Sequence, residues 1–148
     1  MDYYIKRFKE LTVEELYEIL KIRNKVFVVE QNCVYQDCDN KDKEAYHLFI
    51  VDNEEIIAYL RILGRGVSYS EVSVGRVLSN KKYRGKGLGK VAMVKAIEFI
   101  NNTLNENKVR ISAQEYAVPF YEGVGFKVVS KPYLEDDIPH VEMLLIRE

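Results

Sequence analysis

Apolar side chains recur along this chain with two different periods, which predict a mixture of strands and helices. Short apolar runs predict strands at residues 3–8, 47–51, 56–63, 71–79, 108–113, 126–130 and 141–146. Helical spacing predicts helices at residues 12–26, 87–101 and 117–122. The polar segment 32–43 is expected to form a loop. The order β-α-β-β-β-α-β-α-β-β predicts a mixed sheet with helices packed on it.

Composition narrows the class of protein. The chain has 148 residues, 47% hydrophobic and 30% charged, which predicts one domain over residues 1–148. Its formal net charge is -1, so nothing in the overall charge favours nucleic acid or an acidic membrane, and any anion site must be local. No apolar run is long enough to span a bilayer, and the amino terminus lacks the apolar stretch of a signal peptide. These features predict a cytoplasmic protein.

Cysteine and histidine are scarce. Cys33 and Cys38 lie in the predicted loop, and the histidines are His47 and His140. This set is too small for a disulfide framework and unfavourable for zinc, so we expect no metal. The two thiols are expected to be free, with a regulatory disulfide between them as the alternative.

The sharpest chemical signal is the segment 78–90, where a predicted strand enters a glycine-rich turn and a helix leaves it. The first amides of a helix have no internal acceptor, and the positive end of the helix dipole lies at the same point. Glycines also permit close approach of a ligand to the backbone. Local positive charge comes from Lys82, Arg84, Lys86 and Lys90. The segment therefore predicts a phosphate site, with a solvated basic turn as the alternative.

Two common phosphate motifs do not fit this segment. Gly85 and Gly89 are one residue too close for a P-loop, and Val91 stands where a hydroxyl is needed. The third glycine also comes one residue early for the dinucleotide fingerprint. The segment instead resembles motif A of the GNAT acetyltransferases, which it matches as Arg84-x-x-Gly87-x-Gly89.

Further segments extend this resemblance. Residues 113–126 resemble motif B of the same family, with Phe120-Tyr121 followed by Gly125-Phe126. Residues 23–31, 75–77 and 135–143 are similar to the ElaA-like branch, a group described as predicted acyltransferases. The resemblance implies the GNAT fold, an α/β (α+β) single domain with a mixed, mostly antiparallel central sheet flanked by helices.

The resemblance also implies a reaction. Acetyl-CoA would be the cosubstrate, and a primary amine, on a small molecule or a peptide, would attack it directly in a ternary complex. The diphosphate would lie on the amides of residues 84–89, with the pantetheine arm beside the preceding strand. The implied CoA-binding residues are Val77, Leu78, Ser79, Arg84, Gly85, Lys86, Gly87, Leu88, Gly89, Lys90 and Tyr121.

Tyr121 matches the tyrosine that faces the CoA sulfur in the family. A phenol has a reference pKa of about 10, so it stays protonated at neutral pH and can donate to a departing thiolate. The alternative is that Tyr121 merely packs beside Phe120.

Four side chains are candidates for the base that takes the proton of the acceptor amine, namely Glu30, Glu71, His140 and Glu142. His140 has a suitable reference pKa and shares one strand face with Glu142, although a structural histidine is the alternative. Glu30 is expected either to act as the base or contact the substrate, or to form an ion pair with Arg23 or Arg76. The predicted catalytic residues are Tyr121, His140 and Glu30, and the predicted substrate-binding residues are Arg76, Glu30 and Gln31.

Charged residues near the predicted substrate side leave several alternatives open. Period-2 alternation places Arg76 on one face with Val72, Val74 and Leu78, where it would pair with Glu30 or clamp a substrate anion. Arg61 is expected near a sheet edge or with its charged end in solvent. The loop 31–42 is expected to form the substrate-side lip. Its acidic side chains, Asp37, Asp39 and Asp42, either favour a cationic acceptor or are solvated.

Two competing functions remain at this stage. A non-catalytic CoA-binding or regulatory module would keep the glycine loop without chemistry, and the retained Tyr121 argues against it. Binding of nucleic acid by the basic segment 81–90 is disfavoured by the net charge of -1. We expect a monomer or a homodimer.

Overall fold

A computed structural model describes residues 1–147, so the last residue of the predicted domain lies outside the described part of the chain. The strands are β1 (Asp2–Arg7), β2 (Tyr46–Asp52), β3 (Glu55–Leu63), β4 (Val72–Ser79), β5 (Lys108–Gln114), β6 (Lys127–Val128), β7 (Tyr133–Glu135) and β8 (Ile138–Ile146). The α-helices are α1 (Val13–Arg23), α2 (Leu88–Asn102) and α3 (Val118–Gly123). A π-helical segment, Asn24–Glu30, continues α1 further than the sequence predicted.

One eight-stranded sheet, in the order β1-β2-β3-β4-β5-β8-β6 with β7 also paired to β8, organises the chain. Every pairing is antiparallel except that of β4 with β5. The predicted mixed, mostly antiparallel sheet is therefore confirmed, as are its helices. A capping box begins α1, since Thr12 accepts from the amide of Glu15 and the Glu15 carboxylate accepts from the amide of Thr12. No helix within residues 1–147 has the length and apolar character needed to cross a membrane.

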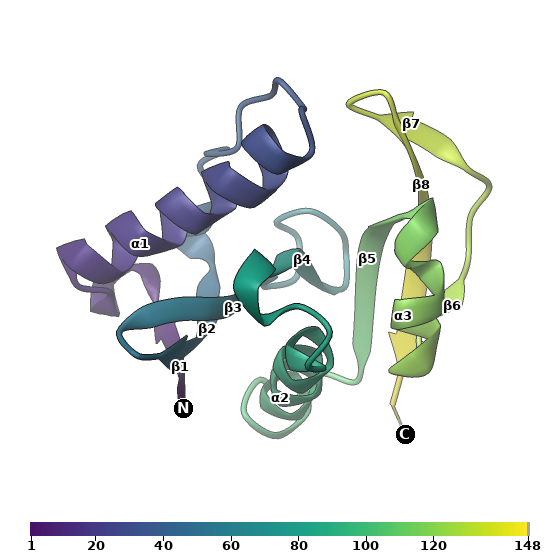
Figure 1. Ribbon diagram of the computed structural model, residues 1–148. Helices are drawn as coiled ribbons and strands as arrows, with labels where there is room; N and C mark the ends of the chain where they lie inside the picture. The colour runs from purple at the N-terminus through teal and green to yellow at the C-terminus, as the bar shows by residue number, and fades with distance from the viewer. Residues whose placement is uncertain (148) are drawn as a thin grey trace.

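Helices cover the sheet on both faces (Figure 1). On one face, the apolar side of α2 packs on residues of the central strands, and Val118 and Tyr121 of α3 extend the same cluster. On the other face, Ile19 and Ile22 of α1 pack with Phe49 and Tyr59. Apolar burial on two sides explains why β2 and β3 read as nearly continuous apolar runs.

A β-bulge in β4 changes the predicted facing of its residues. Arg61 of β3 pairs with Gly75, but Tyr59, two residues away, pairs with Leu78, three residues away, so β4 contains one extra residue. As a result Val74 packs in the α2 cluster and Leu78 in the α1 cluster. The prediction that Arg76 shares a face with both was therefore wrong. Arg76 itself has a left-handed φ of +53°.

Strands β4 and β5 separate from the position of this bulge onward. β4 and β5 pair at only two positions, Val72 with Val109 and Ser73 with Arg110. Beyond them the strands diverge, so residues 75–79 of β4 and the end of β5 have no ladder partner on their facing sides. Where a strand in the middle of a sheet loses its neighbour, its backbone amides and carbonyls on that side are unpaired and available to a ligand.

Candidate active site

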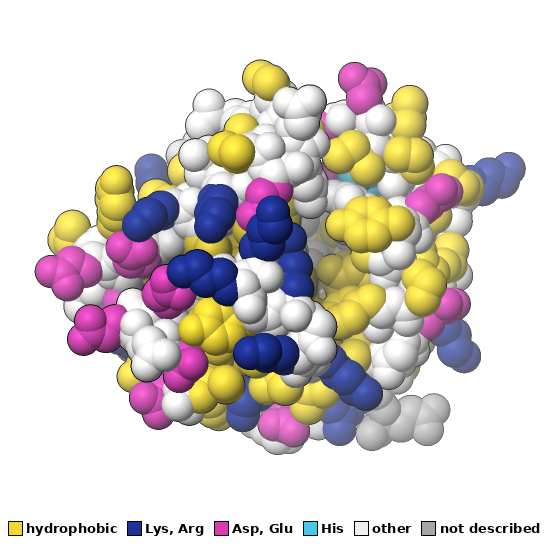
Figure 2. Space-filling view, viewed as in Figure 1, with side chains coloured by type: hydrophobic (Ala, Val, Ile, Leu, Met, Phe, Trp, Pro, Cys, Tyr) yellow, Lys and Arg dark blue, Asp and Glu magenta, His cyan; other side chains and the backbone are white. Residues whose placement is uncertain are grey.

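A cleft of about 290 Å³ opens between the diverging strands. One side includes the end of β4 and Gly89 of α2, and Tyr121 reaches the cleft from α3, which lies beside β5 and β8 (Figure 1). The other includes Ser112 and Gln114 of β5 and His140 of β8. Figure 2 shows this face hollowed, with basic side chains on one side of the hollow and apolar ones on the other. The cleft therefore brings together parts of the chain that lie far apart in the sequence.

The glycine loop before α2 has the conformation that a phosphate site needs. Gly85 and Gly87 have φ values of +84° and +74°, which glycine adopts without strain. No backbone carbonyl within residues 1–147 accepts from the amides of Gly85, Lys86 or Gly87. The first amides of α2 have no acceptor inside the helix, and no side chain caps them. A Cβ at Gly85 or Gly87 would meet no atom within 4 Å, so the loop has open space beside it at both glycines.

The basic side chains of this loop divide into two kinds. Lys82 pairs with Glu55 at 3.2 Å, and Arg84 donates to Ser79 O at 3.2 Å and pairs with Glu30 at 2.6 Å. Lys86 lies over the Tyr83 ring, 5.2 Å from its centre. Lys86 and Lys90 form no ion pair within the described residues, so their charges are available to an anion.

Glu30 does not have the position that we predicted. It pairs with Arg84, rather than with Arg23 or Arg76, and it does not line the cleft. The ion pair joins the end of the π-helical segment to the glycine loop. Glu30 therefore contributes to the arrangement of the loop, and the geometry offers no support for a role as a base.

Tyr121 reaches the cleft from α3. Its ring packs edge-on against Phe120 and Phe126, at centroid distances of 5.0 and 5.9 Å. Burial, with a smaller effect of the neighbouring Tyr116, raises the pKa of Tyr121 to about 12. The phenol thus remains protonated at neutral pH and can donate a hydrogen bond. Tyr121 both packs against its aromatic neighbours and lines the cleft.

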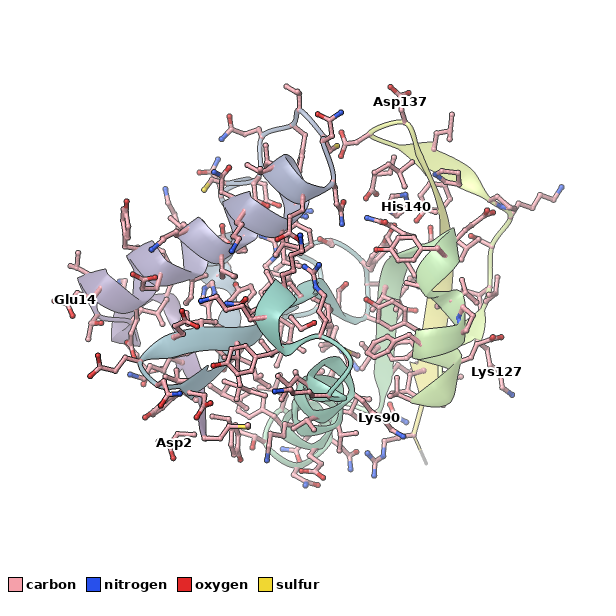
Figure 3. All side chains as sticks on the ribbon, in the orientation of Figure 1. Asp2, Glu14, Lys90, Lys127, Asp137 and His140 are labelled. Carbon is pink, nitrogen blue, oxygen red and sulfur yellow. The ribbon has the colours of Figure 1, made fainter. Side chains whose placement is uncertain are left out.

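The wall opposite the glycine loop is polar. His140 is buried, with only 6% of its surface exposed, and lies beside Glu135 of β7 and Ser112 of β5. Gln31, at the end of the π-helical segment, accepts from Gln114 Nε2 at 3.3 Å, so a hydrogen bond spans the cleft. In Figure 3, His140 lies toward the β7 end of the molecule and Lys90 lies beside α2, toward the other end of α3.

Two of the other candidate bases are already paired. Glu71 accepts two hydrogen bonds from Arg110, both at 3.1 Å, and Glu142 accepts one at 3.0 Å. The hydrogen bonds from Arg110 lower the pKa of Glu71 to about 2, which makes it a weak base. Glu142 does share a strand face with His140, as predicted, but of the two only His140 lines the cleft.

Three arginines and three aspartates form a network beneath the substrate side of the cleft. Arg23 is fully buried and pairs with Asp37 at 2.9 Å and with Asp42 at 2.6 Å. Arg61 pairs with Asp39 at 2.6 Å and with Asp42 at 2.9 Å. Although burial alone would raise them, these arginines hold the pKa values of Asp39 and Asp42 below the usual range.

Arg76 completes the network by pairing with Asp37 at 2.8 Å and with Asp39 at 3.4 Å. Several predictions for this region were therefore wrong. Arg61 is buried in the central strand β3 and is not at an edge. Arg76 lines the cleft, but its partners are aspartates instead of Glu30. The three loop aspartates are paired with arginines of this chain, so they are neither simply solvated nor unpaired sites for a cationic acceptor.

The remaining predicted features lie close to the cleft. Gln31, Cys33 and Tyr35 line it, in agreement with a substrate-side lip. Cys33 is half-buried and Cys38 exposed, and both are free thiols. No group of three histidine, cysteine or acidic side chains that could hold a metal ion occurs within residues 1–147.

Comparison with known proteins is consistent with this geometry. A family model described as an acetyltransferase (GNAT) domain matches residues 9–147. The chain belongs to the GNAT acetyltransferase family. A UPF0039 protein of Schizosaccharomyces pombe is 40% identical over 147 residues, 98% of this chain and 97% of that protein. Escherichia coli ElaA is 39% identical over 136 residues, 90% of this chain and 89% of ElaA.

Solved structures show the same GNAT fold. An acyl-CoA N-acyltransferase from Pseudomonas aeruginosa has a TM-score of 0.92 and 37% identity, covering 98% of this chain and 99% of that one. The crystal structure of E. coli ElaA has a TM-score of 0.91 and 36% identity, with coverages of 97% and 98%. The resemblance to the ElaA-like branch is thus confirmed. Membership in this GNAT family supports acyl transfer, with an acyl-CoA as cosubstrate, as the general chemistry of the chain.

Sequence reasoning missed several residues of this GNAT cleft. Ser112 and Gln114 are two residues apart on β5 and share one of its faces, but only Ser112 falls within the predicted strand 108–113. Glu135 and Tyr133 belong to β7, a strand of three residues that is too short to give a period. The signal for it was the pair Asp136–Asp137, which forms a two-residue turn with both φ values positive.

Proposed function

We propose that this GNAT protein transfers an acetyl group from acetyl-CoA to a primary amine by direct attack within a ternary complex. The observation that carries the proposal is the single cleft. It joins the end of β4 to the Tyr121 phenol, extends to Gly89 at the start of α2, and ends at the polar wall around His140. One ligand can therefore contact the anion site and the phenol together, while a second enters from the opposite wall.

The backbone at the donor end supplies the binding. Amides of residues 84–89 would hold the diphosphate, with charge from Lys86 and Lys90. Hydrogen bonds to charged groups contribute roughly 1.5–3 kcal/mol each, so a few of them account for micromolar affinity. Val77, Leu78 and Ser79 follow the bulge, where β4 has no partner on the cleft side, and their backbone would pair with the pantetheine arm like an added strand.

The chemistry follows from the groups around the thioester. A β4 amide polarises the carbonyl, and the amine nitrogen forms a bond to its carbon as the carbon–sulfur bond breaks. Tyr121 donates a hydrogen bond to the departing thiolate. Its pKa of about 12 exceeds the reference thiol value of ≈8.5, so a hydrogen bond is favoured over complete proton transfer.

The proton of the amine needs an acceptor. A lysine-like amine with a pKa of about 10.4 is neutral in only about one molecule in 2,500 at pH 7, so a base accelerates the reaction. Of the four candidates, His140 is the one that lines the cleft. We assign the role of base to His140. Gln31 and Arg76, which line the same side of the cleft, are the proposed contacts of the acceptor.

The test is an assay of free thiol release from acetyl-CoA with a panel of small amines and peptides, with the acetylated product identified by mass. Propionyl-CoA and butyryl-CoA, used in parallel, test the choice of acetyl. Amine-dependent release supports the proposal. Binding of acetyl-CoA in calorimetry with no release for any amine would instead support the alternative, a non-catalytic CoA-binding module.

A further inference from the structure

The hairpin of β7 and β8 places four side chains on one face. Tyr133 pairs with His140 and Glu135 with Ile138, and side chains alternate along each strand. Tyr133, Glu135, Ile138 and His140 therefore point to the same side, and the last three line the cleft. Glu135 is the diagonal neighbour of His140 across the two strands, a separation that long side chains can bridge.

Contacts of the His140 ring fix its tautomer. Nδ1 lies 2.6 Å from the carbonyl oxygen of Ile138, and a carbonyl can only accept. Nδ1 therefore carries the proton of the neutral ring, and Nε2 carries the lone pair. The ring also stacks on Tyr133, at a centroid distance of 6.1 Å and an angle of 23°, and the Tyr133 hydroxyl is hydrogen-bonded to Ser112. The nitrogen that can accept a proton is thus held in a defined direction.

The atom that faces Nε2 is a carboxylate oxygen. Glu135 Oε2 lies 3.5 Å from His140 Nε2, and the Glu135 side chain is half-exposed. Arg110, near this wall, already binds Glu71 and Glu142. Arg76 is likewise held by two aspartates. Asp136, at the hairpin turn, also lines the cleft, but the carboxylate that pairs with His140 is that of Glu135. Glu135 is therefore the charged group placed to respond when Nε2 becomes protonated.

Resting on the function proposed above, we propose that His140 and Glu135 act as a dyad in which Glu135 is a positioning residue. As the amine attacks, its N–H bond breaks and an Nε2–H bond forms, which gives an imidazolium. The Glu135 carboxylate lies beside that cation and stabilises it. The proton then leaves to solvent through the open cleft, and the ring returns to its Nδ1–H form.

The test compares Glu135→Gln with Asp137→Asn. The Asp137→Asn variant removes the same charge two residues from Glu135, at the tip of the hairpin, and Asp137 does not line the cleft (Figure 3). Its φ of +61° is one that asparagine tolerates. With ethylamine as acceptor, Glu135→Gln is expected to lower kcat roughly tenfold and His140→Gln about 100-fold, within the usual range for acid–base catalysis. Asp137→Asn is expected to stay within about twofold of the unmodified chain, because surface charges contribute little.

A second acceptor separates chemistry from structure. Trifluoroethylamine is largely neutral at pH 7, and its nitrogen becomes acidic enough on attack to release its proton to water. Its reaction therefore depends much less on a base, and the kcat of Glu135→Gln should return close to that of the unmodified chain. Equal losses with both amines, equal losses in Glu135→Gln and Asp137→Asn, or no loss in Glu135→Gln would each overturn the dyad while the proposed function stands. Absence of turnover by the unmodified chain with every amine would remove the proposed function, and the dyad with it.

Discussion

Gly87 offers the most direct test of the anion site. It is the N-cap of α2, with a φ of +74°, and a Cβ there would meet no atom within 4 Å. Asparagine and aspartate are nearly the same shape, tolerate a left-handed φ better than other residues, and are good N-caps. Both variants are therefore expected to fold, and the difference between Gly87→Asn and Gly87→Asp isolates one negative charge at the proposed diphosphate site.

The size of that difference follows from Coulomb's law. Two diphosphate charges about 6 Å from the new carboxylate oppose it by roughly 1.4 kcal/mol in water, and by roughly 5.5 kcal/mol at an effective dielectric constant of ~20. Since about 1.4 kcal/mol is tenfold in affinity, Gly87→Asp should bind acetyl-CoA at least about tenfold more weakly than Gly87→Asn. Added salt should narrow the gap because it screens exposed charges.

Isothermal titration calorimetry with acetyl-CoA at low and high salt measures both effects. Thermal unfolding of the two variants serves as the control, and it should show similar midpoints. Equal affinity of the two variants for acetyl-CoA would refute the placement of the diphosphate on this loop, whatever the family implies.

Three further outcomes are expected. Tyr121→Phe should lower kcat at least about tenfold and leave the Kd of acetyl-CoA within about twofold; an unchanged kcat would show that another group stabilises the thiolate. Asp42→Asn leaves Arg23 and Arg61 buried without their shared charge, so urea unfolding should show a loss of about 3–5 kcal/mol, and a loss below 1 kcal/mol would contradict the structural importance of the network. Because the folded chain holds the pKa of Asp39 low, the unfolded chain takes up a proton first, near pH 3.9. The free energy of unfolding should therefore fall as the pH drops below about 4, and it should fall less steeply in Asp39→Asn; identical slopes would contradict this.

Local features of the sequence predicted the strand, the glycine loop and the helix on one side of the cleft well. The glycines at positions 85, 87 and 89 lie within one turn, and their effect on the backbone depends on their immediate neighbours. The helix that follows is long and strongly periodic, so its start was also predictable. The strand before it was predicted at 71–79, within one residue of the observed bounds of β4.

The side of the cleft around Arg76 was harder to predict because contacts distant in sequence determine it. Period-2 alternation cannot reveal the extra residue in β4, which reversed the facing expected for Arg76. An irregular run of aspartates looks the same whether water or arginine neutralises it. Arg23, which lies about 14 residues before Asp37, gave no sign within its helix of the partners that it has in the fold.

The balance of charge beneath the cleft has a consequence for how this chain can vary. Three guanidinium groups meet three carboxylates there, and each aspartate that pairs across the network contacts two arginines. Losing any single charged side chain of the network leaves an opposite charge unpaired in the interior. A tolerated replacement therefore has to be accompanied by a second, compensating substitution. The segment 37–42, which is irregular apart from the start of a short 3-10 helix, is thereby as restricted in composition as an apolar core position.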